Sequence, residues 1–84
     1  MIYAYKDIED VFGYSKTFLL DLIKANCFPI QSFGKGKTAR WLKIDIDAYL
    51  GFLTNNLTID TSLISKPRLN EIKICAENFK KRTA

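Results

Sequence analysis

Residues 13–50 read GYSKTFLLDLIKANCFPIQSFGKGKTARWLKIDIDAYL, and the rest of the chain is interpreted around them. A turn at Gly13 leads into an apolar helical pattern, which Pro29 prevents from continuing. Two β-prone runs then flank GKGK at residues 34–37, where the glycines allow the positive φ angles of a tight hairpin. A second helical pattern closes the segment. This order predicts a mostly helical α+β fold, a small winged helix-turn-helix with a two-stranded wing and an added C-terminal helix.

Helix boundaries can be predicted from single residues. Residues 5–12 form a first helix, which Gly13 ends in the left-handed conformation common at helix C-termini. Ser15 is a good N-cap for the second helix, which ends at Asn26 or Cys27. Asp45 is expected to cap the third helix, which carries apolar residues at helical spacing.

The second helix has two different sides on a helical wheel. The side expected to face the core holds Leu19, Leu22, Ile23 and Asn26, with Lys16 and Phe18 at its edges. The side expected to face outward holds Thr17, Leu20, Asp21 and Lys24. A helix-turn-helix presents such an outward side to a DNA groove.

The chain divides into residues 1–54, a winged helix-turn-helix; residues 55–65, a connector; and residues 66–84, a basic amphipathic helix. The connector is expected to dock through Leu57, Ile59, Leu63 and Ile64. One side of the last helix is lined by Leu69, Ile72, Ala76 and Phe79, with Cys75 beside them. This stripe needs a surface, which its own domain, a second copy or another protein can supply. We expect packing on its own domain.

The net charge of +4 is unevenly distributed. Residues 1–65 hold seven basic and seven acidic side chains, and residues 66–82 hold six basic against two acidic ones. Within the neutral part, residues 16–43 hold six basic side chains against Asp21 alone. Two basic regions indicate a polyanionic partner, although scattered, solvated lysines give the same totals.

The chain contains no histidine. This excludes nucleophiles activated by histidine and most zinc sites. Most carboxylates fall in the first turns of predicted helices, where they complement the helix dipole: Asp7, Glu9, Asp10, Asp45 and Asp47. We therefore expect a non-enzyme with no catalytic residue, no metal ligands and no cofactor.

Cys27 and Cys75 are far apart and lack metal-binding spacing. We expect reduced, partly buried thiols, with a lone disulfide as the alternative. No apolar run is long enough to span a membrane, and the N-terminus lacks the features of a signal peptide. A cytoplasmic protein with no membrane partner is expected.

An ordered set of features runs through residues 5–50: Gly13, Ser15, Leu22-Ile23, Pro29, the GKGK run, Arg40-Trp41 and an Asp-led segment from Asp45 to Leu50. In this order the set resembles the AlpA/excisionase group of small winged-helix proteins, relatives of the MerR-type DNA-binding domain. The resemblance implies a small non-enzymatic DNA-binding protein of a phage or mobile genetic element, either excisionase-like or a transcriptional regulator. It would act in a bacterial cell or a phage-infected host.

The resemblance also implies site residues. Ser15, Lys16 and Thr17 would enter the major groove of duplex DNA, and Lys24 would lie near the backbone. Lys35, Lys37 and Arg40 would hold phosphates from the wing, and Trp41 would pack in the core. We expect the lysine-tipped wing and the helix capped by Ser15 to lie side by side as one contact surface. A homo-oligomer on DNA is a possible assembly.

Leu20-Asp21 departs from the expected recognition helix, because such helices usually carry an aromatic or polar residue followed by a basic one. Leucine cannot hydrogen-bond a base edge, and a carboxylate repels phosphates. The alternative is therefore an adaptor for a larger replication or recombination enzyme, such as a polymerase or primase. Its candidate contacts are Leu20, Asp21, Leu69, Ile72 and Phe79. We rank DNA binding first, by analogy of fold.

Overall fold

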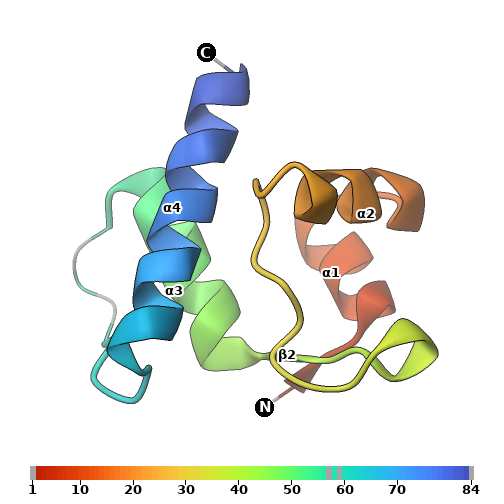
Figure 1. Cartoon of the computed structure of the whole chain (residues 1–84), viewed down its shortest axis with the longest axis horizontal. Coiled ribbons are helices and arrows are strands. Elements are labelled where there is room, and N and C mark those ends of the chain that lie inside the picture. The colour runs from red at the N-terminus through yellow and green to blue at the C-terminus, as the bar shows by residue number, and fades with distance from the viewer. Residues whose placement is uncertain (1, 57, 59, 84) are drawn as a thin grey trace.

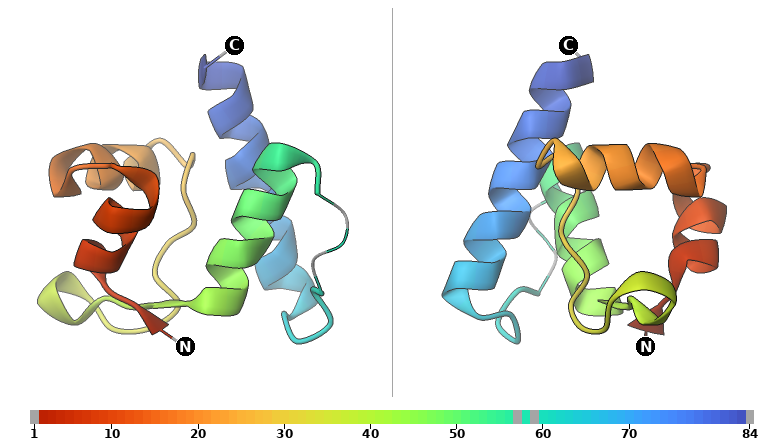
Figure 2. Two further views of the ribbon diagram at one scale, coloured as in Figure 1. Left: turned by 180° about the vertical axis from the view of Figure 1, so that it is seen from behind. Right: turned by 45° about the vertical axis from the view of Figure 1, so that its right-hand side comes forward.

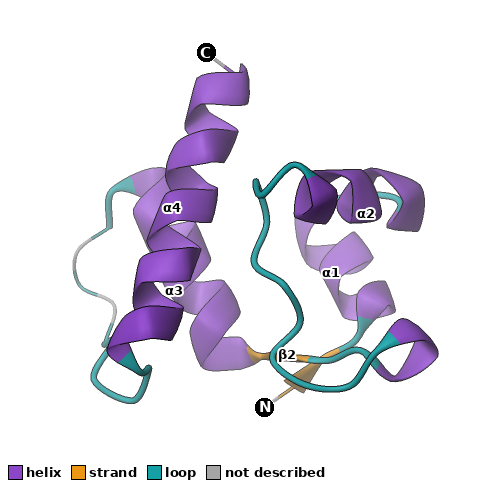
Figure 3. Cartoon of the chain, viewed as in Figure 1, coloured by secondary structure: helices purple, strands orange, loops and turns teal. Residues whose placement is uncertain are grey.

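The computed structural model describes residues 2–56, 58 and 60–83 of the chain. Within them, four α-helices accompany a two-stranded antiparallel sheet (Figures 1 and 3). The elements are β1 (Ile2–Tyr3), α1 (Tyr5–Phe12), α2 (Lys16–Lys24), the short 3-10 helix η1 (Gly36–Thr38), β2 (Trp41–Leu42), α3 (Lys43–Thr54) and α4 (Lys66–Thr83). The predicted mostly helical α+β class is confirmed.

The turn between α1 and α2 forms as predicted. Gly13 adopts a φ of 73°, and its N–H donates to the carbonyl of Glu9 at 2.7 Å. Ser15 Oγ accepts a hydrogen bond from the N–H of Phe18 at 3.2 Å, which caps α2. The helix stops at Lys24, slightly earlier than predicted, and Asn26 follows in the left-handed region with a φ of 60°. Asn26 is therefore exposed, although the wheel placed it on the inner side.

The predicted two-stranded wing is not formed. Phe33 and Arg40 make one isolated bridge, and η1 lies between them. Thr38 closes this turn, because its Oγ1 donates to the carbonyl of Lys35 at 2.8 Å and accepts from the N–H of Lys35 at 3.2 Å. A hairpin tip is thereby replaced by a compact loop. We call residues 33–40 the basic loop.

The sheet forms instead between residues 2–3 at the N-terminus and residues 41–42. Ile2 pairs with Leu42, and Tyr3 pairs with Trp41. The run before the basic loop lies on the other edge of β2, but it makes no regular ladder there, because the N–H of Leu42 donates to Ser32 Oγ at 3.0 Å and not to a backbone carbonyl. The helix α3 then begins at Lys43, which ends β2.

Asp45 is not the cap of α3. The helix begins at Lys43, and Leu42 occupies the N-cap position without a capping side chain. Asp45 is buried in the first turn, where its Oδ2 accepts from Ser32 Oγ at 2.6 Å and from Arg68 Nε at 3.2 Å. The carboxylate holds three segments together.

The core is aromatic. Phe28 makes edge-to-face contacts with Trp41, Tyr49 and Phe12. The polar atoms of the two deepest rings have partners: Trp41 Nε1 donates to the carbonyl of Pro29 at 2.9 Å, and the Tyr49 hydroxyl donates to that of Cys27 at 2.6 Å. The predicted core role of Trp41 is confirmed by its complete burial.

Helix α4 lies alongside α3, and α1 and α2 lie across the molecule from the connector (Figures 1 and 2). Ile72 and Ala76 are fully buried against the core. Nearer its C-terminus, α4 reaches the turn that follows α2, where Asn78 Nδ2 donates to the carbonyl of Asn26 at 2.9 Å. The apolar stripe of α4 is thus covered by its own chain.

Two smaller predictions have clear outcomes. Cys27 and Cys75 are free, buried thiols. In the connector Ile64 is buried but Leu63 is 78% exposed, so only one of these two residues docks. Leu57 and Ile59 lie outside the described residues. Among the helices of the described part, none combines the length and apolarity needed to cross a membrane.

Candidate nucleic-acid interface

The outer face of α2 is open to solvent. Thr17, Leu20, Asp21 and Lys24 are all exposed, as the helical wheel predicted. Ser15 is also exposed, but its oxygen already accepts the N–H of Phe18. A hydroxyl that accepts one hydrogen bond still has its own proton to donate. The start of α2 therefore offers hydroxyl and backbone donors together with the Lys16 ammonium.

Lys16 lies against an aromatic platform that joins α2 to the sheet. Its Nζ is 4.9 Å from the ring centroid of Tyr5. The Tyr5 ring packs edge-on against Trp41, with 5.3 Å between centroids and 75° between planes. Because Trp41 directly follows Arg40, this contact series connects the start of α2 with the base of the basic loop. The cation–π contact holds the exposed ammonium near one position.

The basic loop presents two lysines and is held closed by its arginine. Lys35 and Lys37 are exposed. Arg40 is half-buried, and its Nη1 donates to the carbonyls of Ala39 at 2.8 Å and Lys37 at 3.1 Å. Gly34 fits because it adopts a φ of 76°, and a Cβ there would lie 2.1 Å from the carbonyl oxygen of Thr38. Arg40 thus maintains the conformation of the loop.

The basic loop does not lie directly beside α2. α2 is near one end of α1, and the loop is near the other (Figures 1 and 2). The predicted continuous surface of ribbon and helix is therefore wrong, because η1 shortens the ribbon to a compact turn.

Lys43, the first residue of α3, is paired. Its Nζ lies 2.7 Å from Asp47 Oδ2, and this hydrogen bond raises the pKa of the Lys43 ammonium. Within the described part of the chain, no three cysteine, aspartate or glutamate side chains are placed to hold a metal ion. The exposed cations of Lys16, Lys24, Lys35 and Lys37 are available contacts for a phosphate backbone.

The proposed protein-contact residues separate into two groups. Leu20 is 38% exposed, and Phe18 on the same helix is 39% exposed. By contrast, Ile72 is fully buried, and Leu69 and Phe79 are half-buried against the core. Of these three α4 residues only Ile72 is completely covered, and Leu69 and Phe79 remain partly exposed.

Sequence reasoning missed Arg68 and Tyr5. Arg68 is held by Asp45 and by the carbonyl of Ile30, to which its Nη2 donates at 2.6 Å. One signal for this site was present, since Asp45 lies between two isoleucines in an apolar run, where a buried carboxylate needs a cation. Tyr5 had no comparable signal, because a tyrosine in a short helix is usually part of the core.

Comparisons with known proteins found no match to the chain among family models, curated proteins or solved structures.

Proposed function

We propose that this chain is a small, non-enzymatic protein that binds duplex DNA through the start of α2 and the basic loop. The proposal depends on one observation, the contact of the Lys16 ammonium with the face of the Tyr5 ring and the edge-to-face contact of Tyr5 with Trp41. That series relates the cation of α2 to the loop that carries Lys35 and Lys37.

Each group has a role that suits its chemistry. Lys16, Lys35 and Lys37 neutralise phosphates, with release of counterions. Ser15 and Thr17 lie at the N-terminus of α2, where N–H groups and the helix dipole favour an anion. Lys24 lies at the other end of α2 and meets a more distant phosphate. Arg40 acts indirectly, by keeping the loop closed.

The finer biological role rests on the ordered motif set of residues 5–50, which resembles excisionase-like proteins and regulators of phages and mobile elements. We propose such a role in a bacterial cell or phage-infected host, with a cytoplasmic location. Binding of several copies along one DNA site is part of this proposal. The number of chains bound to each duplex, measured on duplexes of increasing length, tests this part of the proposal.

The test is a titration of labelled duplex DNA, followed by fluorescence anisotropy at several salt concentrations. The variant Lys35→Glu/Lys37→Glu should bind at least about tenfold more weakly, with a salt slope lower by about two. The matched control is Lys66→Glu/Lys73→Glu, which makes the same charge change on α4, and it should keep most of the affinity. Equal losses in the two variants, or binding insensitive to salt, would contradict the proposal.

A second candidate function is that of an adaptor for a larger replication or recombination enzyme. The observation that favours it is the exposure of Phe18, Leu20 and Asp21 on α2, since apolar side chains beside a carboxylate suit a protein interface better than DNA. Leu20→Lys should abolish a salt-resistant partner complex and should strengthen DNA binding. A complex that forms normally with this variant would exclude the adaptor role of α2.

A further inference from the structure

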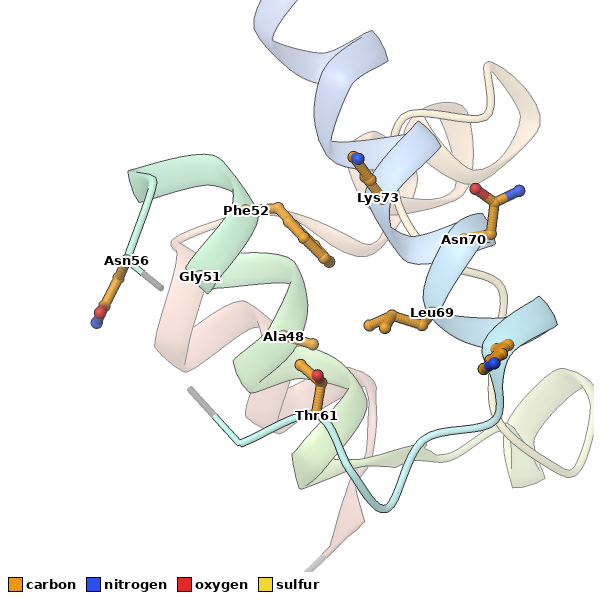
Figure 4. Close-up of a pocket in the computed structure, with 9 residues that line it drawn as sticks. Ala48, Gly51, Phe52, Asn56, Thr61, Leu69, Asn70 and Lys73 are labelled. Atoms are coloured by element: carbon orange, nitrogen blue, oxygen red, sulfur yellow. The ribbon is translucent and has the colours of Figure 1, made fainter. Parts of the chain in front are cut away.

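An open cleft of about 450 Å³ lies between α3, α4 and the connector (Figure 4). The helices α3 and α4, which supply most of its lining, are on the other side of the molecule from α2 and the basic loop (Figure 1). The described residues that line it are Ala48, Gly51, Phe52, Asn56, Thr61, Lys66, Leu69, Asn70 and Lys73. None of them belongs to the DNA-binding surface proposed above.

The floor of the cleft is apolar. Phe52 on α3 and Leu69 on α4 point toward each other across the gap between the helices (Figure 4). Both side chains are only partly buried. Ala48 and Gly51 line the same stretch of α3 and leave space beside these larger side chains. The space suits one large apolar side chain from outside.

The rim of the cleft is basic. Lys66 and Lys73 are exposed, and among the described residues neither makes an ion pair or a hydrogen bond. No carboxylate lines the cleft in the part of the chain that the structure describes. In contrast, Lys43 and Arg68 on the neighbouring surfaces are both paired with aspartates. The two rim lysines are thus available to an external anion.

We infer that this cleft binds a short acidic segment of a partner protein. One large apolar side chain of the segment enters between Phe52 and Leu69, and its carboxylates pair with Lys66 and Lys73. These lysines are seven positions apart on α4, which is about 10 Å along the helix axis. Two acidic residues four positions apart in an extended peptide point to the same side about 13 Å apart, a distance that the two long lysine side chains can reach.

The shape of the cleft favours a peptide over a free amphiphilic anion such as a fatty acid. The cleft is open along one side, so a single acyl chain would remain largely in contact with water. A peptide covers the apolar floor with its own backbone. Asn70 and Thr61 on the rim offer an amide and a hydroxyl to that backbone. This inference does not depend on DNA binding.

The experiment is an NMR titration of the ¹⁵N-labelled full chain with a capped peptide of about seven residues. In this peptide two glutamates, four positions apart, stand on either side of a central phenylalanine, so that all three side chains point to one side of the extended chain. Amide shifts should be confined to the residues around the cleft. Replacement of the phenylalanine by alanine should weaken binding at least about tenfold. Replacement of both glutamates by glutamine should weaken binding about threefold.

The protein variants separate this inference from the DNA proposal. Lys66→Glu/Lys73→Glu should lose peptide binding, and Lys35→Glu/Lys37→Glu should bind the peptide as the parent chain does. Well-dispersed amide spectra show that both variants are folded. In two further experiments the chain is titrated with octanoate, and its spectra are compared at several chain concentrations without any ligand.

Three results would overturn the inference. The first is peptide binding that Lys66→Glu/Lys73→Glu leaves unchanged, or shifts that fall on the outer face of α2. The second is octanoate binding as tight as that of the peptide, which would assign the cleft to small amphiphiles. The third is concentration-dependent shifts of the cleft without any peptide, which would assign it to a second copy of the chain.

Discussion

Arg68 Nε lies 3.2 Å from Asp45 Oδ2, and this pair ties the first turn of α4 to the first turn of α3. The same carboxylate accepts from Ser32 Oγ, and Ser32 Oγ accepts from the N–H of Leu42 at 3.0 Å. Arg68 also donates to the carbonyl of Ile30. The segment before the basic loop is therefore positioned by a residue of the last helix.

Loss of Arg68 should lower the free energy of unfolding by more than is expected for a partly exposed side chain. Arg68→Ala leaves the buried Asp45 carboxylate without its cation, and we expect a loss of about 3 kcal/mol in the free energy of unfolding, measured by urea denaturation. Arg82→Ala on the exposed end of α4 is the control and should change it by less than about 0.5 kcal/mol.

A double-mutant cycle isolates the pair. Asp45→Asn removes the charge that Arg68 compensates, so the combination with Arg68→Ala should cost less than the sum of the single changes by about 1 kcal/mol or more. Strictly additive losses would show that Arg68 stabilises the fold through its other hydrogen bonds.

Stability should fall at alkaline pH. Burial raises the pKa of the Tyr49 and Tyr14 phenols above the ordinary 10.0 and that of the Cys75 thiol above 9.0. The folded chain then retains protons that the unfolded chain releases, so stability is constant below these ordinary values and decreases as pH rises through them. The slope approaches at most about 1.4 kcal/mol per pH unit for each group.

Urea denaturation between pH 8 and pH 11 measures this decrease, at roughly half-unit steps. Tyr14→Phe removes one of the three groups and should make the alkaline decline shallower, because the phenylalanine ring keeps the contacts with Phe12 and Phe18. A free energy of unfolding that stays constant over this range would contradict the burial of these groups.

Substitution by alanine should have different effects at Gly13 and Gly34. Gly13 has nothing within 4 Å of the position of a Cβ, so Gly13→Ala should cost only the left-handed backbone strain, about 1–2 kcal/mol. At Gly34 the Cβ would collide with the backbone of Thr38, so Gly34→Ala must change the loop conformation.

The readout for Gly34→Ala is the set of amide chemical shifts across the Phe33–Arg40 bridge, together with DNA affinity. We expect large local shifts and weaker DNA binding, with global stability affected less than by Arg68→Ala. Unchanged shifts at Phe33 and Arg40 would mean that the loop does not adopt the closed turn.

Ser15 has a structural role and a proposed DNA-binding role, and two substitutions separate them. Ser15→Ala loses the cap and should cost about 1 kcal/mol of stability. Ser15→Asp keeps an oxygen acceptor for the N–H of Phe18, so stability should be retained, while the added negative charge should weaken DNA binding. Equal DNA affinities of Ser15→Asp and the parent chain would remove Ser15 from the interface.

The failure of the wing prediction has a cause at each end of the predicted ribbon. At the tip, Thr38 hydrogen-bonds Lys35 and converts the glycine-rich segment into a 3-10 turn. At the base, the N–H of Leu42 donates to Ser32 Oγ and not to a backbone carbonyl, and α3 begins at Lys43. The β propensity of residues 41–42 was read correctly, but propensity does not specify the partner strand.

Local sequence was sufficient for α1, α2, their turn and the outward side of α2, because caps and helix faces depend on residues within about four positions. The pairing of β1 with β2, the Asp45–Arg68 pair and the basic-rimmed cleft came from three-dimensional packing. Each of these joins segments that are far apart in the chain, as Arg68 and Ile30 are, at 38 positions apart. Such contacts form only when the whole core brings the segments together, so no pattern within a single helix or strand specifies them.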